Sequence, residues 1–277
     1  MTQNDKSALP FIESCYQDMT QTEKTAAQWF LNGNRPEDPS LKAMAQLLSV
    51  SEATLVRFAK KCGFRGYREF MYQYQKSLAA SEADTKVTDS TLTVLDAYQT
   101  LLTNCYSLID EAQISRIAEM ISSASRICVG GLGSSGLAAK EMAYRLMRVG
   151  YPMEAVDDLD MLRMTAVFKG ENDLVIGLSL SSSRPEFLEY LRTAKERGAR
   201  TILITSNRRE QTQKLVDELV LVPSLVHMNW GHFISPQFPF LVMTDILYAA
   251  CMQTNRREKQ SLHGRTLKAL NERSTKE

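Results

Sequence analysis

The stretch RICVGGLGSSG, residues 126–136, decides the fold of the larger part of this chain. Its first half is a short β-rich run, and its second half is a glycine- and serine-rich loop that opens a helical pattern. Glycine lets the backbone approach a ligand closely, and the amide groups at the start of a helix favour an anion. The stretch therefore predicts a strand, a phosphate-binding loop and a helix in succession.

The same alternation of strand and helix patterns continues towards the C-terminus. We expect strands over 127–132, 151–156, 174–180, 201–205 and 219–222, and helices over 137–149, 159–168, 185–197 and 210–216. Such alternation requires crossover connections, which predicts an α/β fold with a doubly wound parallel sheet covered by helices on both faces. Ligands of such sheets bind beyond the carboxyl ends of the strands.

A second loop with polar side chains follows another of these expected strands. The stretch LSLSSSRPE, residues 178–186, leads from a strand through hydroxyl groups into a helix whose first position suits Pro185. Hydroxyl and amide groups together supply several directed donors, which can hold a phosphate without Mg²⁺. Two such loops at equivalent strand ends favour one anion site.

The N-terminal region differs from this pattern and is basic. Residues 41–80 carry seven lysines and arginines and two acids, and five of the bases lie between Arg57 and Arg68. A basic run alone is also typical of a solvated helix face. Here it accompanies apolar spacing that predicts helices over 22–30, 41–48 and 52–62, the last two joined by a short link. That arrangement is typical of an all-α helix-turn-helix domain that reads DNA.

The geometry of a helix-turn-helix assigns roles along the third expected helix. Ser51 caps this helix, Ala53, Val56 and Ala59 are expected to face inward, and the start of the helix points towards base edges. The DNA-binding candidates are the cap Ser51, the base-reading Glu52, Ala53, Thr54 and Arg57, and the phosphate-binding Lys60, Lys61, Arg65, Tyr67 and Arg68.

Composition limits the remaining function classes. The 277 residues carry 33 lysines and arginines against 32 acids, as in ordinary globular proteins. The five cysteines have no C-x-x-C spacing, so we expect buried thiols and neither a zinc site nor disulfides. Without a secretory pattern or a membrane-spanning run, we expect a cytoplasmic protein that does not enter a membrane. The expected domains are 1–80 (DNA-binding), 81–95 (linker), 96–255 (sheet) and 256–277 (charged helix or tail).

Several of these stretches together resemble one known family. The segments SLKAMA (40–45) and SEATLVRFAKKCGFRGY (51–67) resemble the helix-turn-helix of the RpiR/MurR transcriptional regulators. The segments GLGSS (131–135), AKEMAYRL (139–146) and AKERGA (194–199) resemble their sugar isomerase (SIS) domain. The resemblance implies a regulator of sugar catabolism that acts as a repressor and not as an enzyme, and whose SIS domain senses a sugar phosphate without a cofactor.

The resemblance also assigns ligand-binding residues by position. Ser134 and Ser135, beside Gly133, correspond to the first hydroxyl loop, and Ser179 and Ser181 to the serines of the family's Ser-x-Ser-Gly-x-Thr loop. This chain departs from that pattern, because Ser182 replaces the glycine and Arg184 replaces the threonine. A guanidinium group in this loop is expected to replace part of the hydroxyl and amide contacts to a phosphate.

Two alternatives and one assembly question stay open. Glu186 opens a helix beside the second loop, so it could serve a sugar-phosphate isomerase as proton shuttle. The spacing Gly131-x-Gly133-x-x-Gly136, with Glu154 or Asp157 downstream, also satisfies a dinucleotide fingerprint and allows an NAD-sensing regulator. Because paired operator half-sites need a two-fold protein, we expect a homodimer or homotetramer, and the apolar stretch 237–252 is expected in the core or a subunit contact.

Overall fold

The computed structural model describes residues 8–80, 90–229 and 231–271. It divides into two compact units, which are considered separately below. Residues 81–89 of the expected linker and residues 272–277 of the expected tail lie outside the described residues. Within the described ranges, every helix is too short or too polar to cross a bilayer.

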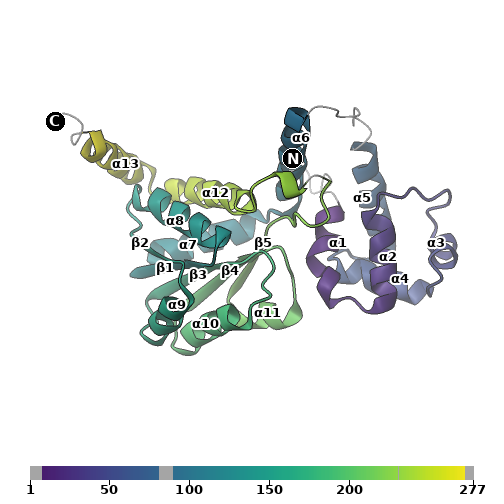
Figure 1. Cartoon of the computed structure of the whole chain (residues 1–277), viewed down its shortest axis with the longest axis horizontal. Helices are drawn as coiled ribbons and strands as arrows, with labels where there is room; N and C mark the ends of the chain where they lie inside the picture. The colour runs from purple at the N-terminus through teal and green to yellow at the C-terminus, as the bar shows by residue number, and fades with distance from the viewer. Residues whose placement is uncertain (1–7, 81–89, 230, 272–277) are drawn as a thin grey trace. The chain divides into compact units, whose positions relative to one another are not determined.

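The first unit, called the head unit here, comprises residues up to Ile109 together with Ser206–Glu210 and Pro223–Ser235. Its α-helices are α1 (Leu9–Cys15), α2 (Gln21–Leu31), α3 (Leu41–Leu47), α4 (Glu52–Lys61), α5 (Tyr67–Ala80) and α6 (Ser90–Leu108) (Figure 1). Short 3-10 turns lie at Tyr16–Asp18 and Gly231–Phe233. The three helices expected for the DNA-binding domain are confirmed as α2, α3 and α4, and α6 begins inside the range expected as linker.

Side-chain caps fix where the helices of the head unit begin. At α2, Thr20 Oγ1 accepts a hydrogen bond from the Glu23 amide (3.3 Å), and Glu23 Oε2 accepts one from the Thr20 amide (2.8 Å). At α4, Ser51 Oγ accepts from the Thr54 amide (3.1 Å). These contacts satisfy amides that a helix start leaves without a partner. The cap expected at Ser51 is confirmed.

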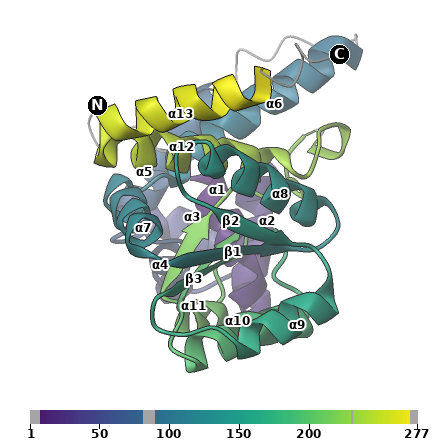
Figure 2. The same ribbon diagram turned by 90° about the vertical axis from the view of Figure 1, so that its left-hand side faces the viewer.

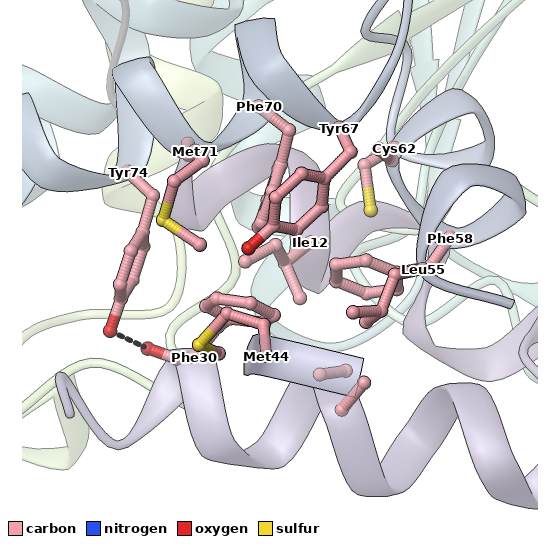
Figure 3. Packing of buried hydrophobic residues seen from close by; sticks show 14 of the residues in the cluster. Ile12, Phe30, Met44, Leu55, Phe58, Cys62, Tyr67, Phe70, Met71 and Tyr74 are labelled. Atoms are coloured by element: carbon pink, nitrogen blue, oxygen red, sulfur yellow. Dashed lines mark hydrogen bonds between the residues drawn. The ribbon is translucent and has the colours of Figure 1, made fainter. Parts of the chain in front are cut away.

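Aromatic rings fill the core of the head unit (Figure 3). The ring of Phe30 stacks on Phe58 with centroids 5.6 Å apart and meets Phe70 edge-on at 4.8 Å, and all three are fully buried. The hydroxyl of Tyr74 donates to the Phe30 carbonyl (3.1 Å). One orientation expected from the sequence is wrong: Ala53 is exposed, because the fully buried Leu55 occupies the core side of α4.

The five cysteines are free and buried, which confirms the expectation of buried thiols. Two of them meet inside the head unit, where Cys15 Sγ lies 3.4 Å from Cys62 Sγ. Burial, followed by the neighbouring Cys15 thiol, raises the pKa of Cys62 well above its ordinary value. A thiol with a raised pKa is a poor nucleophile, and the Cys62 thiol lies in the packed core of the head unit.

The second unit, called the sheet unit here, has five parallel strands in the order β2-β1-β3-β4-β5 (Figures 1 and 2). The strands are β1 (Arg126–Gly131), β2 (Met153–Val156), β3 (Asp173–Leu178), β4 (Arg200–Thr205) and β5 (Glu218–Leu221). The helices are α7 (Glu111–Ser123), α8 (Ser134–Met147), α9 (Leu159–Val167), α10 (Pro185–Glu196), α11 (Glu210–Leu215), α12 (Phe238–Thr254) and α13 (Arg256–Asn271). Figure 1 shows α7, α8 and α12 on one face of the sheet and α9, α10 and α11 on the other. The doubly wound fold is confirmed.

The strand order places the two expected ligand loops next to each other. After β1 the chain forms β2 on one side and then returns to form β3 on the other side of β1. Gly131 at the end of β1 is paired in register with Leu178 at the end of β3. The reversal of strand order between β1 and β3 is the position where open α/β sheets bind ligands.

The last two helices account for the C-terminal segments. The apolar α12 packs on α7 and α8, with Phe240, Met243 and Leu247 among its buried side chains. The charged segment that follows forms α13, in which Lys259 Nζ lies 3.6 Å from the centroid of the Tyr151 ring. The C-terminal segment is therefore helical as far as the structure describes it.

Candidate functional site

A cavity of about 220 Å³ lies at the carboxyl ends of β1 and β3. It is lined by both expected loops and the starts of the helices that follow them: Leu132, Gly133, Ser135, Leu178, Ser179, Leu180, Ser181, Arg184 and Phe187. Of the expected ligand residues, the structure therefore brings together Gly133, Ser135, Ser179, Ser181 and Arg184. The sequence did not single out the apolar members, because leucine and phenylalanine at strand and helix ends are typical of the core.

Two glycines shape the loop after β1. Gly133 has φ +56°, in the left-handed region that favours glycine, and forms the N-cap of α8. A Cβ on Gly131 would lie 2.5 Å from the Ser135 carbonyl oxygen, so only glycine permits this tight turn. The turn brings Ser135 to the cavity, whereas Ser134, the first residue of α8, is exposed and does not line it.

Ser182 holds the loop after β3 instead of lining the cavity. Its φ is +45°, a conformation that a glycine adopts without strain, and its side chain is buried. The Ser182 hydroxyl lies 2.7 Å from Thr205 Oγ1, and the Ser182 amide donates to Ser179 Oγ (3.2 Å). Thr205 Oγ1 in turn donates to the Leu180 carbonyl (2.9 Å). The serine thus keeps the glycine's backbone shape and ties the loop to the end of β4.

Arg184 supplies the positive charge of the cavity. It is the N-cap residue of α10 and is exposed, and its guanidinium group makes no hydrogen bond or ion pair with any residue that the structure describes. The positive ends of the α8 and α10 dipoles lie at the same cavity. Since none of the lining residues is acidic, the site favours an anion.

The lining residues offer no group that exchanges protons near neutral pH. They include no histidine, aspartate, glutamate, lysine or cysteine, and arginine stays protonated in proteins. Glu186, the candidate proton shuttle, lies in the first turn of α10, is exposed, and is not among them. The lining thus offers hydroxyl groups, backbone amides and one guanidinium group, which are donors suited to an anion.

The dinucleotide-like spacing has a packing explanation. A Cβ on Gly136 would lie 2.6 Å from the Asp157 Cβ, so the third glycine lets α8 pack closely against this residue. Asp157 Oδ2 is ion-paired with Lys140 Nζ at 2.6 Å. Glu154 is exposed on β2. Close packing of α8 thus accounts for a glycine that a dinucleotide fingerprint also requires.

Seven of the expected DNA-binding residues lie exposed on the head unit. They are Ser51, Glu52, Ala53, Arg57, Lys60, Arg65 and Arg68. Arg57 Nη2 donates to Thr54 Oγ1 at 3.2 Å. The side chains of Lys60 and Arg68 have no ion pair within the described part of the chain. The exposed side of α4 therefore carries cations without competing carboxylates, apart from Glu52 at its start.

The other three expected DNA-binding residues make contacts inside the head unit. Thr54 is buried and its hydroxyl lies 2.8 Å from Ser51 Oγ. Tyr67 is buried and its hydroxyl donates to the Pro39 carbonyl at 2.9 Å. Lys61 Nζ binds Glu23 Oε2 at 2.6 Å. Their partners are distant in sequence or also polar, so sequence alone could not separate them from the exposed set.

The Lys61–Glu23 pair joins α4 to α2. Burial opposes ionisation of Glu23, but hydrogen bonds from Lys61 and the Thr20 amide prevail and lower its pKa below the ordinary value. Lys61 also donates to the Asp18 carbonyl at 3.1 Å. Since the Glu23 carboxylate is almost fully buried, Lys61 is its main compensating charge.

Comparison with known proteins agrees with both units. A helix-turn-helix domain model of the rpiR family matches residues 6–81, and a SIS domain model matches residues 120–235. An uncharacterized HTH-type transcriptional regulator of Haemophilus influenzae is 30% identical over 260 residues, covering 89% of this chain and 90% of that protein. The HTH-type transcriptional regulator RpiR of Escherichia coli is 25% identical over 264 residues, covering 91% and 88%.

Solved structures show the same fold. The Vibrio vulnificus NanR protein complexed with ManNAc-6P has a TM-score of 0.60 at 22% identity, covering 95% of this chain and 98% of that one. The sugar isomerase domain of an RpiR transcription factor from Sphaerobacter thermophilus has a TM-score of 0.57 at 18% identity, covering 64% and 97%. With its helix-turn-helix, its parallel-sheet SIS domain and a relative of 30% identity along nearly its whole length, the chain belongs to the RpiR family of transcriptional regulators.

Proposed function

We propose that this chain is a repressor that binds a double-stranded DNA operator through its head unit and senses a sugar phosphate in its sheet unit. The observation that carries the effector part is the cavity at the ends of β1 and β3, which combines hydroxyls, helix N-termini and Arg184 without an acidic side chain. In this proposal the chain is not an enzyme, because no lining residue can shuttle a proton.

The phosphate has a specific place in this proposal. Ser135, Ser179 and Ser181 supply hydroxyl groups, the starts of α8 and α10 supply amides, and Arg184 supplies a charge-assisted hydrogen bond. The buried Ser182 stabilises the loop after β3 through its hydrogen bonds to Thr205 and Ser179. The related NanR was solved with ManNAc-6P, which supports a phosphorylated sugar as the class of effector.

The DNA-binding part rests on α4. Its first two turns expose Glu52, Ala53 and Arg57, at positions that a recognition helix presents to base edges, and Lys60 is exposed further along the helix. Two heads in a homodimer or homotetramer would read paired half-sites. We propose 1–80 as the DNA-binding domain, 81–95 as the connection and 96–255 as the SIS domain, with 256–277 as a C-terminal extension.

Calorimetric titration of the full-length protein tests the effector site. We expect at least one member of a sugar-phosphate panel to bind, and its unphosphorylated sugar not to bind. Replacing Arg184 by threonine, the residue at this place in the family pattern, should weaken that binding about 10- to 100-fold, since hydrogen bonds to charged groups contribute about 1.5–3 kcal/mol. The matched control is Arg197→Thr at the C-cap of α10, where binding should stay unchanged.

The same titration separates the alternatives. Binding of NADH without binding of any sugar phosphate would favour the NAD-sensing regulator. Interconversion of an aldose phosphate and a ketose phosphate, lost on Glu186→Gln, would favour the isomerase. For the proposed regulator, Ser181→Ala should abolish the response to sugar phosphate and leave ligand-free DNA binding intact.

A further inference from the structure

One buried side chain outside the cavity is bonded to the loop after β3. Thr205 is the last residue of β4, is fully buried, and does not line the cavity. Its hydroxyl donates to the Leu180 carbonyl (2.9 Å) and lies 2.7 Å from the Ser182 hydroxyl. A hydroxyl has one hydrogen to donate, so Ser182 is the donor in the second bond. Thr205 thus holds this loop at two points.

Ser182 has a backbone conformation that a side chain makes unfavourable. Its φ of +45° lies in the left-handed region, which glycine adopts readily and a residue with a Cβ adopts only at a cost. Such a conformation persists where the surrounding structure holds it in place. The bond from the Ser182 hydroxyl to Thr205 Oγ1 supplies that hold, and a glycine would not need it.

The conformation of Ser182 decides which groups of the loop face the cavity. Ser179, Ser181 and Arg184 line the cavity, whereas Ser182 between them is 1% exposed. The Ser182 amide donates to Ser179 Oγ at 3.2 Å. The Ser179 hydroxyl therefore keeps its hydrogen for an acceptor in the cavity, such as a phosphate oxygen.

We propose that Thr205 is a positioning residue of the phosphate site and acts through Ser182 to set the affinity for phosphate. This inference rests on the proposed function, which assigns the phosphate to the cavity. Without the Thr205 hydroxyl, the loop loses both side-chain bonds to the end of β4, and Ser182 is free to leave the left-handed region. The donors of the loop would then have to be ordered again when phosphate binds, which weakens the affinity.

Calorimetric titration of the full-length protein with inorganic phosphate, at constant ionic strength, tests this role. We expect Thr205→Val, which keeps the shape of the side chain and removes its hydroxyl, to weaken phosphate binding about 10-fold. Thr205→Ser retains the hydroxyl and should bind phosphate within about threefold of the wild type.

The matched control is Thr201→Val at the other end of β4. The Thr201 hydroxyl is also buried, but it donates to Asp217 Oδ2 (3.0 Å) and does not line the cavity. Its removal should lower the free energy of unfolding and leave the affinity for phosphate unchanged. Equal losses of affinity in Thr201→Val and Thr205→Val would show a general effect of β4 and contradict the proposal.

A second background separates positioning from a general loss of stability. Glycine at residue 182 adopts the backbone of the loop without an anchor, so in Ser182→Gly the further change Thr205→Val should weaken phosphate binding by about threefold or less. If Thr205 only stabilised β4, the loss would be the same in both backgrounds. An equal loss in the two backgrounds, or an unchanged affinity in Thr205→Val alone, would overturn the proposal.

Two variants of residue 182 keep the test valid if Thr205→Val does not fold. Ser182→Ala and Ser182→Gly both lack the hydroxyl, but only Ser182→Ala retains a Cβ at the unfavourable φ. We expect Ser182→Ala to bind phosphate about 10-fold more weakly than Ser182→Gly. Equal affinities of these two variants would refute the need for an anchor at Thr205.

The inference and the proposed function can fail separately. Binding of inorganic phosphate but of no sugar phosphate would refute the proposed effector and leave the Thr205 comparison intact. If only a sugar phosphate binds, the same comparisons are made with it, and equal affinities of the wild type and Thr205→Val would refute the inference alone. A wild-type protein that binds neither ligand would refute both.

Discussion

Lys60 and Lys61 are adjacent in sequence and equal in charge, but they have different surroundings. Lys60 is exposed and has no ion pair within the described residues, whereas Lys61 holds the buried Glu23 carboxylate and the Asp18 carbonyl. A lysine engaged in the fold is less available to a phosphate. The two residues therefore test whether α4 binds DNA through its exposed side.

We predict that Lys60→Ala reduces the slope of log affinity for DNA against log salt by about 0.9, the value for one phosphate contact. Lys61→Ala should leave that slope nearly unchanged and lower the free energy of unfolding by about 1–3 kcal/mol, because it leaves Glu23 buried without its main partner. Fluorescence anisotropy at several salt concentrations and urea unfolding measure the two effects. Equal changes of slope in both variants would contradict this division.

Glu13 gives the head unit a pH-dependent stability. The side chain is buried in α1, its Oε2 has no hydrogen-bond partner among the described residues, and burial raises its pKa from 4.5 to about 8. The folded state therefore binds a proton that the unfolded state releases above pH 4.5. Between pH 4.5 and about 8, this residue makes the protein less stable as pH rises, by at most about 1.4 kcal/mol per unit.

We predict that Glu13→Gln removes this loss, because the amide carries no proton to release. The variant should exceed the wild type in stability at pH 7.5 and differ little from it at pH 4.5. Urea unfolding of the full-length chain, followed by fluorescence of its two tryptophans, measures this at both pH values. The exposed Glu37→Gln serves as control. A gain that is equal at the two pH values would show that Glu13 titrates normally.

The residue types in the sequence located the candidate DNA-binding and ligand-binding segments along the chain, but they did not predict which side chains within those segments are buried. Thr54 and Tyr67 are polar and were expected at the DNA, but their hydroxyls bond to Ser51 and Pro39 inside the head unit. Ser182 was expected at the ligand, and its hydroxyl bonds to Thr205. Each of these partners becomes a neighbour only through tertiary structure, which a linear pattern does not contain.

At the scale of elements, helix caps and the periodicity of apolar residues were sufficient to predict the strands and helices of the sheet unit. The expected strands and helices of the sheet unit match the observed ones closely, because β-branched runs there alternate with capped apolar helices. The short α1, with sequence LPFIESC, was not expected, since seven residues show less than two periods of a helix. The turn between α3 and α4 was expected, but not its backbone conformation.

That conformation gives a prediction about the helix-turn-helix. Ser49 in the turn has φ +53°, which costs a residue with a Cβ about 1–2 kcal/mol, and its side chain is exposed. Replacing Ser49 by glycine would relieve this strain, but the greater conformational freedom of glycine in the unfolded chain offsets part of the gain in stability. We expect Ser49→Gly to raise the free energy of unfolding by about 0.5–1 kcal/mol.

Urea unfolding checks this change against Ser40→Ala at the start of α3. That variant removes the acceptor for the Ala43 amide (3.3 Å) and should lower the stability by about 1 kcal/mol. A loss of stability in Ser49→Gly would show that the serine side chain has a role beyond the turn's geometry.

At the scale of the whole molecule, DNA binding is proposed for the head unit and effector binding for the sheet unit. The head unit exposes Arg57 and Lys60 on α4, the helix proposed to bind DNA, and the sheet unit forms a cavity without acidic lining residues where the strand order reverses. Membership of the RpiR family joins these features in one regulator.

The most direct test uses DNA that the full-length protein selects from a random pool and a sugar phosphate that the protein binds. The affinity of the protein for this DNA is measured with and without a saturating concentration of the sugar phosphate. We predict that the sugar phosphate changes this affinity at least tenfold in the wild type and in Arg197→Thr. In Arg184→Thr, the same concentration should produce a much smaller change. An affinity that is equal with and without the bound sugar phosphate in the wild type would contradict the account.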